Sequence, residues 1–175
     1  YGCSKGAADQ YALDWFRSYG LPTCVLRMSC IYGPRQMGVE DQGWVAHFVR
    51  RAMVGEPIAI FGDGRQVRDV LHVSDAVEAY LGAWARIDDV AGRAFNLGGG
   101  PENAVSLLQV IAAIERLIGS RIELTFSDWR VGDQRYYVSD TRAIRSALNL
   151  RPAMDWREGL ADLVSWVRSD MGLNV

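Results

Sequence analysis

Lysine is almost absent from this chain of 175 residues. Nineteen positions carry Lys or Arg, and Lys5 alone is a lysine. Arginine presents a planar fork of donors that stays charged, whereas lysine is a compact cation with three rotatable donors. A single lysine in an arginine-rich chain therefore indicates a position that a guanidinium group does not suit. Lys5 follows Tyr1 by four residues, so a helix would put both side chains on one face.

Cysteines, long apolar runs and excess charge are also scarce. Cys3, Cys24 and Cys30 form an odd count without CxxC spacing, which argues against a disulfide framework or a zinc site. The sequence has no signal peptide and no apolar run long enough to cross a bilayer. Its net charge of −2 argues against nucleic acid or an anionic membrane surface as partner. We therefore expect a cytoplasmic protein with no metal site.

The pairing of Tyr1 with Lys5 suggests acid/base chemistry. A free phenol titrates near pH ~10, roughly three units too high for a base at neutral pH, which corresponds to about 4 kcal/mol. A neighbouring cation favours the phenolate and reduces that gap. Tyr-x-x-x-Lys also occurs by chance, so an exposed helical pair without function is the alternative interpretation.

Hydrophobic periodicity predicts an α/β fold with right-handed crossovers. The predicted helices cover 1–19, 44–54, a segment beginning at Ser74, 106–118, 141–148 and 157–170. The predicted strands cover 23–28, 57–61, 67–73, 94–97 and 122–126. We expect the segment 31–34 to break the first strand, and 67–73 to be only partly paired.

The third predicted helix has a clear apolar spacing. Val77, Tyr80, Leu81 and Trp84 recur at helical intervals, so we expect them to form its buried face.

Five motifs follow one another along the chain. They are Tyr1-x-x-x-Lys5, Arg27-x-x-x-x-Tyr32-Gly33-Pro34-Arg35-Gln36, Arg68-Asp69-x-x-His72-Val73-x-Asp75, Asn96-x-Gly98-Gly99 and Arg130-x-x-Asp133. Together they resemble the extended short-chain dehydrogenase/reductase family, which comprises NAD-dependent nucleotide-sugar epimerases and dehydratases. The resemblance implies the C-terminal part of a Rossmann-type NAD-binding fold with a small α/β substrate-binding domain.

The resemblance also implies how the chain is divided. Residues 1–36 and 72–98 would belong to the NAD-binding domain, and residues 37–71 and 99–175 to the nucleotide-sugar domain. The chain begins directly on the candidate tyrosine, which we interpret as the start of a fragment. A missing upstream half would hold the Gly-rich dinucleotide loop and the Ser or Thr that partners the tyrosine.

The same resemblance implies roles for individual residues. Tyr1 and Lys5 would be catalytic and would bind the NAD cofactor. The implied substrate-binding residues are Arg68 and Arg130 for the diphosphate, Asp133 for the ribose, and Ala59 and Phe61 for the base. Arginine forks suit phosphate because they make two parallel hydrogen bonds.

Two of these assignments have a structural alternative. Arg68 could instead pair with the adjacent Asp69, and Phe61 could be a core residue.

His72 is better explained as structural than as a base. Cys30 stands where the family commonly has Asn, and a thiol is a poor donor, so Cys30 is not expected to bind substrate. Trp44 is expected near the substrate entrance.

Longer runs narrow the resemblance within the family. Residues 1–11, 41–45, 64–72 and 133–140 resemble enzymes that epimerise carbon 2 of a CDP-linked 3,6-dideoxyhexose, a precursor of O-antigen sugars. The alternatives are another nucleotide-sugar epimerase, a 4,6-dehydratase, or a non-catalytic nucleotide-sugar-binding module. The resemblance further implies a homo-oligomer whose small-molecule partner is a nucleotide sugar.

Overall fold

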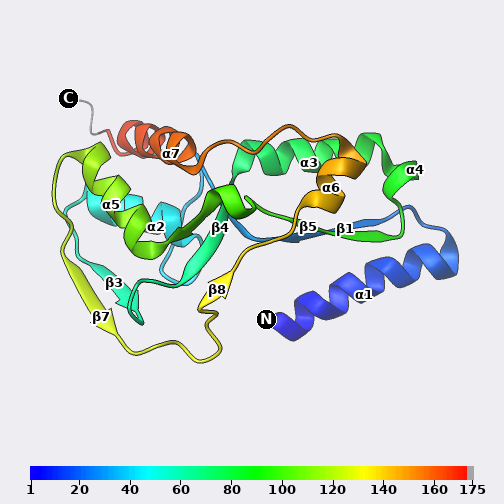
Figure 1. Cartoon of the computed structure of the whole chain (residues 1–175), viewed down its shortest axis with the longest axis horizontal. Helices are drawn as coiled ribbons and strands as arrows, with labels where there is room; N and C mark the ends of the chain where they lie inside the picture. Colours follow the sequence, from blue (N-terminus) through cyan, green and yellow to red (C-terminus); the bar gives the residue numbers. More distant parts are fainter. Residues whose placement is uncertain (173–175) are drawn as a thin grey trace.

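The computed structural model describes residues 1–172 and has the α/β architecture that the sequence predicts. The helices are α1 (Gly2–Tyr19), α2 (Trp44–Met53), α3 (Val73–Ala85), α4 (Ile87–Val90), α5 (Leu107–Ile118), α6 (Arg142–Leu148) and α7 (Trp156–Asp170), with a 3-10 turn at Pro101–Asn103. The strands are β1 (Cys24–Met28), β2 (Cys30–Tyr32), β3 (Ile58–Phe61), β4 (Val67–His72), β5 (Arg93–Leu97), β6 (Ala104–Ser106), β7 (Leu124–Ser127) and β8 (Tyr136–Tyr137). Strands and helices alternate over much of the chain (Figure 1).

Three small groups of strands form the sheets. Strand β1 pairs in parallel with β5, with Met28 opposite Leu97. Strand β4 pairs with β2 and β8 in parallel and with β6 in antiparallel orientation, and β3 pairs in parallel with β7. Within residues 1–172, β1 has β5 as its one partner, so its other edge is open.

Two predictions about extended segments are wrong. The segment 31–34 does not end the sheet, because Cys30–Tyr32 form β2 and pair with β4. The chain changes neighbours at Ser29, whose N–H donates to Leu97 O and whose hydroxyl oxygen lies 2.8 Å from Asp69 O. Strand β4 is paired along its whole length, with β2 on its second half and with β6 and β8 on its first half.

The helices pack around two hydrophobic cores. One core joins α2, α5 and α7 with β3 and includes the fully buried Val49, Ile60, Ile114 and Leu163. The other lies where α3 and α6 cover β5 (Figure 1), while α1 packs on the opposite side against β1.

Helix α3 differs most from its prediction. It begins at Val73 rather than at Ser74, because the ring of His72 caps it and accepts from the N–H of Ser74. The predicted buried face is also wrong. The four residues assigned to it are at least half exposed; they are Val77, Tyr80, Leu81 and Trp84.

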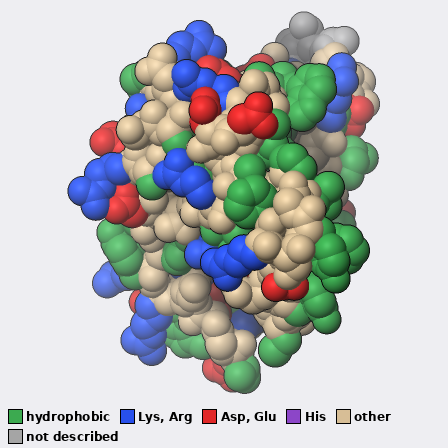
Figure 2. All heavy atoms as spheres, turned by 90° about the vertical axis from the view of Figure 1, so that its right-hand side faces the viewer, with side chains coloured by type: hydrophobic (Ala, Val, Ile, Leu, Met, Phe, Trp, Pro, Cys, Tyr) green, Lys and Arg blue, Asp and Glu red, His purple; other side chains and the backbone are tan. Residues whose placement is uncertain are grey.

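The face of α3 that is buried consists of small residues. Ala76, Ala79 and Ala83 are all less than a tenth exposed. Small side chains let a helix backbone approach a sheet closely, so here size rather than hydrophobicity decides which face turns inward. Figure 2 looks onto the end of the molecule where α3, α4 and the end of α1 lie (compare Figure 1), and shows hydrophobic side chains gathered along one side.

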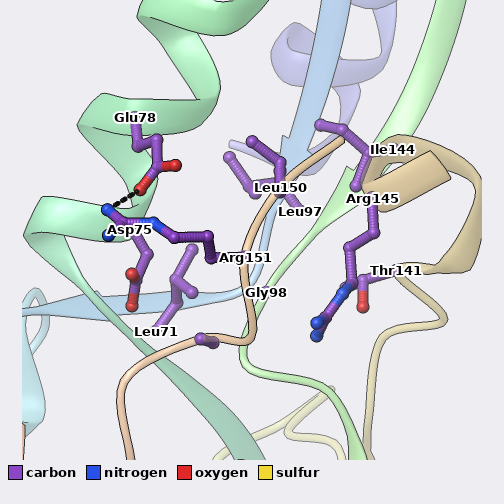
Figure 3. Close-up of a pocket in the computed structure, with 11 residues that line it drawn as sticks. Leu71, Asp75, Glu78, Leu97, Gly98, Thr141, Ile144, Arg145, Leu150 and Arg151 are labelled. Carbon is purple, nitrogen blue, oxygen red and sulfur yellow. Dashed lines mark hydrogen bonds and ion pairs between the residues drawn. The ribbon is translucent and has the colours of Figure 1, made fainter. Parts of the chain in front are cut away.

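A small cavity lies between α3 and α6 (Figure 3). Leu71, Leu97 and Ile144 form its apolar wall, and Arg151 and Glu78, which form an ion pair at 3.0 Å, also line it. None of the predicted site residues lines this cavity, and its apolar wall belongs to the second core.

Candidate active site

A larger cavity opens where β3, β4 and two loops meet. It encloses about 720 Å³, open solvent included. All five predicted substrate-binding residues line it, namely Ala59, Phe61, Arg68, Arg130 and Asp133. We call it the nucleotide cavity, after the ligand that the resemblance implies for these five residues.

The alternation of side chains along β3 explains how that strand contributes. Ile58 and Ile60 are fully buried in the core, so the intervening Ala59 and Phe61 point to the other face and stay partly accessible. The interpretation of Phe61 as an ordinary core residue does not fit this arrangement.

Arg68 forms a hydrogen bond with a residue that is distant in the sequence. Its Nη2 donates to Asp133 Oδ1 at 2.7 Å, and its Nη1 donates to Val67 O at 2.8 Å. The Arg68 side chain is 13% exposed and that of Asp133 is 28% exposed, so the pair is largely shielded from water. The alternative ion pair between Arg68 and Asp69 does not form among the described residues.

Asp69 instead has a structural environment. Its carboxylate is fully buried and accepts hydrogen bonds from the hydroxyls of Ser29 and Ser139 and from the N–H of Gly100. Several donors can satisfy a buried carboxylate without a cation. Gly98 packs so closely against this cluster that a Cβ atom there would collide with Asp69 and Ser139. Asp69 therefore ties β4 to three other segments while Arg68 faces the cavity.

Arg130 is held by two acidic residues that the sequence analysis did not single out. Its Nη2 lies 3.0 Å from Glu40 Oε1 and its Nη1 lies 3.0 Å from Asp41 Oδ1. Its guanidinium carbon sits 3.9 Å from the ring centroid of Phe61, within cation–π range. In the sequence, these two adjacent acidic residues stand in a glycine-containing turn before Trp44. That position could have marked them as candidates, but no motif linked them to Arg130.

Cys30, Trp44 and Gln66 complete the polar lining. Trp44 Nε1 donates to Cys30 Sγ at 3.4 Å, and burial raises the pKa of the Cys30 thiol, so it stays neutral. Trp44 lines the cavity. The amide nitrogen of the buried Gln66 donates to Phe61 O, and its amide oxygen has no partner among the described residues. Such an unsatisfied acceptor favours a ligand that brings a donor.

Tyr1 and Lys5 lie at the start of α1, along a second cavity. Lys5 Nζ is 5.5 Å from the centroid of the Tyr1 ring, so the two side chains share a face as predicted. The second cavity also has Met28 and Ser29 in its wall. Because Ser29 lines one cavity and Cys30 the other, the two cavities lie on either side of the β1–β2 junction.

The two histidines lie outside both cavities. His72 is buried, with Nδ1 2.8 Å from the Ser74 hydroxyl and Nε2 3.3 Å from an Asp162 oxygen, too poorly aligned for a hydrogen bond. Burial lowers the pKa of His47, which contacts Phe48 by its ring. Within residues 1–172, no cluster of His, Cys, Asp or Glu is arranged to hold a metal ion, and no helix there is long and apolar enough to span a membrane.

Comparison with known proteins adds independent information. Residues 1–98 match the model of the NAD dependent epimerase/dehydratase family. The chain is 40% identical to CDP-paratose 2-epimerase of Salmonella typhi over 97% of the chain and 52% of that protein. It is 34% identical to a dTDP-glucose 4,6-dehydratase of Actinoplanes sp. over 97% of the chain and 51% of that protein.

A solved structure shares the fold. UDP-glucose 4-epimerase of Thermotoga maritima, crystallised with UDP-glucose, superposes with a TM-score of 0.89 at 33% identity, over 98% of this chain and 54% of that one. The expected Rossmann-type architecture is thereby confirmed. The chain spans about half the length of the curated relatives it matches.

Proposed function

The chain belongs to the NAD dependent epimerase/dehydratase family, and from this membership we propose that the protein epimerises a nucleotide-linked sugar. The substrate we propose is CDP-paratose or CDP-tyvelose, inverted at carbon 2 through a transient keto sugar. The similarity to CDP-paratose 2-epimerase supports this choice. We also propose a cytoplasmic role in making O-antigen sugars.

One observation carries the proposal. Five residues that are up to 74 positions apart in the sequence (Ala59 to Asp133) line one cavity, and they supply what a nucleoside diphosphate requires. Arg68 and Arg130 offer guanidinium forks for phosphate oxygens, and the carboxylate of Asp133 can accept from ribose hydroxyls. Ala59 and Phe61 offer an apolar surface for a base.

The residues beside α1 fit the nicotinamide end of NAD. An ammonium group and a phenol share one face there, and Lys5 can donate to ribose hydroxyls while Tyr1 faces the same cavity. When bound, NAD supplies the redox chemistry that removes and restores the hydrogen at the sugar carbon. The Gly-rich loop expected for the rest of the dinucleotide does not occur in these 175 residues.

The remaining steps fall to this chain's own side chains. Tyr1, as phenolate, takes the proton of the sugar hydroxyl and later returns it, and Lys5 favours the phenolate by its charge. The arginines hold the diphosphate while the keto sugar turns over to present its other face. Anchoring at the diphosphate therefore lets the sugar change orientation without leaving the protein.

Two other functions are alternatives to this proposal. A dTDP-glucose 4,6-dehydratase activity is supported by the second relative. A non-catalytic nucleotide-sugar-binding module would keep the nucleotide cavity but not need the Tyr1–Lys5 pair, so the presence of that pair favours the enzyme.

Turnover distinguishes these readings. The complete gene product is incubated with CDP-paratose, CDP-tyvelose, dTDP-glucose or UDP-glucose, and the products are followed by proton NMR in deuterated buffer. We expect interconversion of the two CDP sugars. Conversion of dTDP-glucose instead would establish the dehydratase, and binding without conversion of any substrate would establish the module.

We further propose a homo-oligomer. Helix α1 exposes three aromatic side chains, Tyr11, Trp15 and Tyr19, each by about half or more. Exposed aromatic side chains on one helix favour burial against another subunit. Light scattering of the complete gene product measures this directly, and a monomer at all concentrations would refute it.

A further inference from the structure

The nucleotide cavity contains more negative than positive side chains. Its charged lining consists of two guanidinium groups, Arg68 and Arg130, and three carboxylates, Glu40, Asp41 and Asp133. A nucleoside diphosphate brings further negative charge to the same cavity. Like charges at close range repel, so this inventory does not suit the ligand unless some carboxylates move away from the arginines.

The contacts of Arg130 resemble those that a phosphate group would make. Glu40 and Asp41 are consecutive, and each binds a different terminal nitrogen of Arg130 at 3.0 Å. Two oxygens on the two terminal nitrogens is the bidentate arrangement in which arginine recognises phosphate. The two carboxylates thus occupy the positions that phosphate oxygens need.

The acidic residues sit at the tip of a narrow turn. Val39 N donates to Gln42 O at 2.8 Å, and Gln42 N donates to Val39 O at 3.1 Å, which leaves Glu40 and Asp41 between them. The base of the turn is packed tightly, because a Cβ atom on Gly38 would collide with Gly43 O. The turn is therefore fixed at its base and carries its carboxylates out to Arg130.

The ion pairs of Arg130 with Glu40 and Asp41 are weak enough for a ligand phosphate to break them. The side chains are 37% exposed for Arg130, 52% for Glu40 and 81% for Asp41, and such exposed pairs contribute little. The more shielded pair between Arg68 and Asp133 differs in this respect. A phosphate group should therefore displace the carboxylates on Arg130 more easily than the carboxylate on Arg68.

We propose that Glu40 and Asp41 are affinity-setting residues that compete with the substrate diphosphate for Arg130. This inference rests on the proposed function, since it takes Arg130 as a diphosphate ligand. The two carboxylates lower the affinity for every ligand whose phosphates must reach Arg130. A ligand without phosphate leaves the contacts intact and its affinity does not depend on them.

Isosteric amides test the competition. In the double variant Glu40→Gln/Asp41→Asn of the complete gene product, calorimetric titration should show CDP binding about tenfold tighter, because two exposed ion pairs no longer oppose it. The affinity for cytidine should stay unchanged. Raising the salt concentration should reduce the difference between variant and wild type for CDP, since screening weakens the same ion pairs.

A matched control uses an acidic residue away from the cavity. Glu56 pairs with Arg51 at 2.6 Å and is similarly exposed, so Glu56→Gln should leave CDP affinity unchanged. If the double variant binds CDP no tighter than wild type, the inference is wrong while the proposed function stands. If the wild-type protein binds no CDP, UDP or dTDP, both fail.

Discussion

Arg68 and Asp133 are 65 positions apart in the sequence, yet Arg68 Nη2 donates to Asp133 Oδ1 at 2.7 Å. The contact joins β4 to the loop that precedes β8, and β8 pairs with β4 at Val67 and Arg68. The cation assigned to the diphosphate and the carboxylate assigned to the ribose are therefore held in one fixed relationship. A nucleotide that engages Arg68 would meet Asp133 at the same time.

Replacing the guanidinium of Arg68 tests this relationship. Arg68→Lys keeps the charge but loses the fork, so the bidentate phosphate contact and the bond to Asp133 cannot both form. Hydrogen bonds to charged groups contribute roughly 1.5–3 kcal/mol, so CDP affinity should fall by about ten- to a hundredfold. Calorimetric titration measures it. Arg121→Lys changes an arginine that is 92% exposed and pairs with Glu115, and should have no effect.

Lys5→Arg tests the argument from amine geometry. A guanidinium group cannot present rotatable donors at a single point, so turnover of the complete gene product should fall by at least about a hundredfold. CDP affinity should stay near that of wild type, because Lys5 lines a different cavity from Arg68. Arg17→Lys, on the same helix, is the matched control. Near-normal turnover in Lys5→Arg would show that the amine is not required.

Local patterns in the sequence predict the elements better than they predict their surroundings. The helices over 44–54 and 106–118 and the strand over 57–61 lie within about two residues of their predicted bounds, because their periodicity is strong. Segment 31–34 was predicted to break the first strand because it contains Gly33 and Pro34, yet residues 30–32 form β2. Its pairing with β4 depends on residues 70–72, which no local pattern can reveal.

In the candidate site, too, the sequence predicted some residues and not others. Motif order indicated Arg68, Arg130 and Asp133, and the structure brings all three to one cavity. Glu40 and Asp41 were missed because their importance depends on Arg130, which lies 89 or more positions further along the chain. The buried face of α3 was predicted wrongly, because hydrophobicity alone does not show that a helix packed closely on a sheet needs alanine on the contact face.

The buried thiol of Cys30 gives a prediction with a pH dependence. Burial raises the pKa of the Cys30 thiol above its ordinary value, so the reactive thiolate forms at higher pH than in an unfolded peptide. Alkylation by iodoacetamide at Cys30, mapped by mass spectrometry, should accordingly be slow at pH ~8 compared with a cysteine in an unfolded peptide. Because Cys30 lines the nucleotide cavity, CDP should slow its alkylation further, and the exposed Cys3 should be unaffected by CDP.

The same shift has a consequence for stability. A thiol whose pKa is raised on folding contributes stability that is complete below the unfolded pKa and is lost as pH rises through the folded pKa. Wild-type protein should thus lose more stability above pH ~9 than Cys30→Ala does. Urea denaturation at pH 8 and pH 10 gives the difference, and equal losses in both proteins would contradict the assignment.

The packing around Asp69 gives the last prediction. In Gly98→Ala the new methyl group would collide with the side chains of Asp69 and Ser139, and a displaced Asp69 would leave a buried carboxylate with fewer donors. Overpacking and a lost hydrogen bond each cost about 1–3 kcal/mol, so the free energy of unfolding should fall by about 2–6 kcal/mol in urea denaturation. Gly6→Ala is the matched control, because its added Cβ has no atom within 4 Å apart from its chain neighbours and the helix backbone, and alanine is favoured inside α1. That variant should gain about 0.5–1 kcal/mol. Equal stability of the two variants would mean that the carboxylate cluster does not depend on a glycine at position 98.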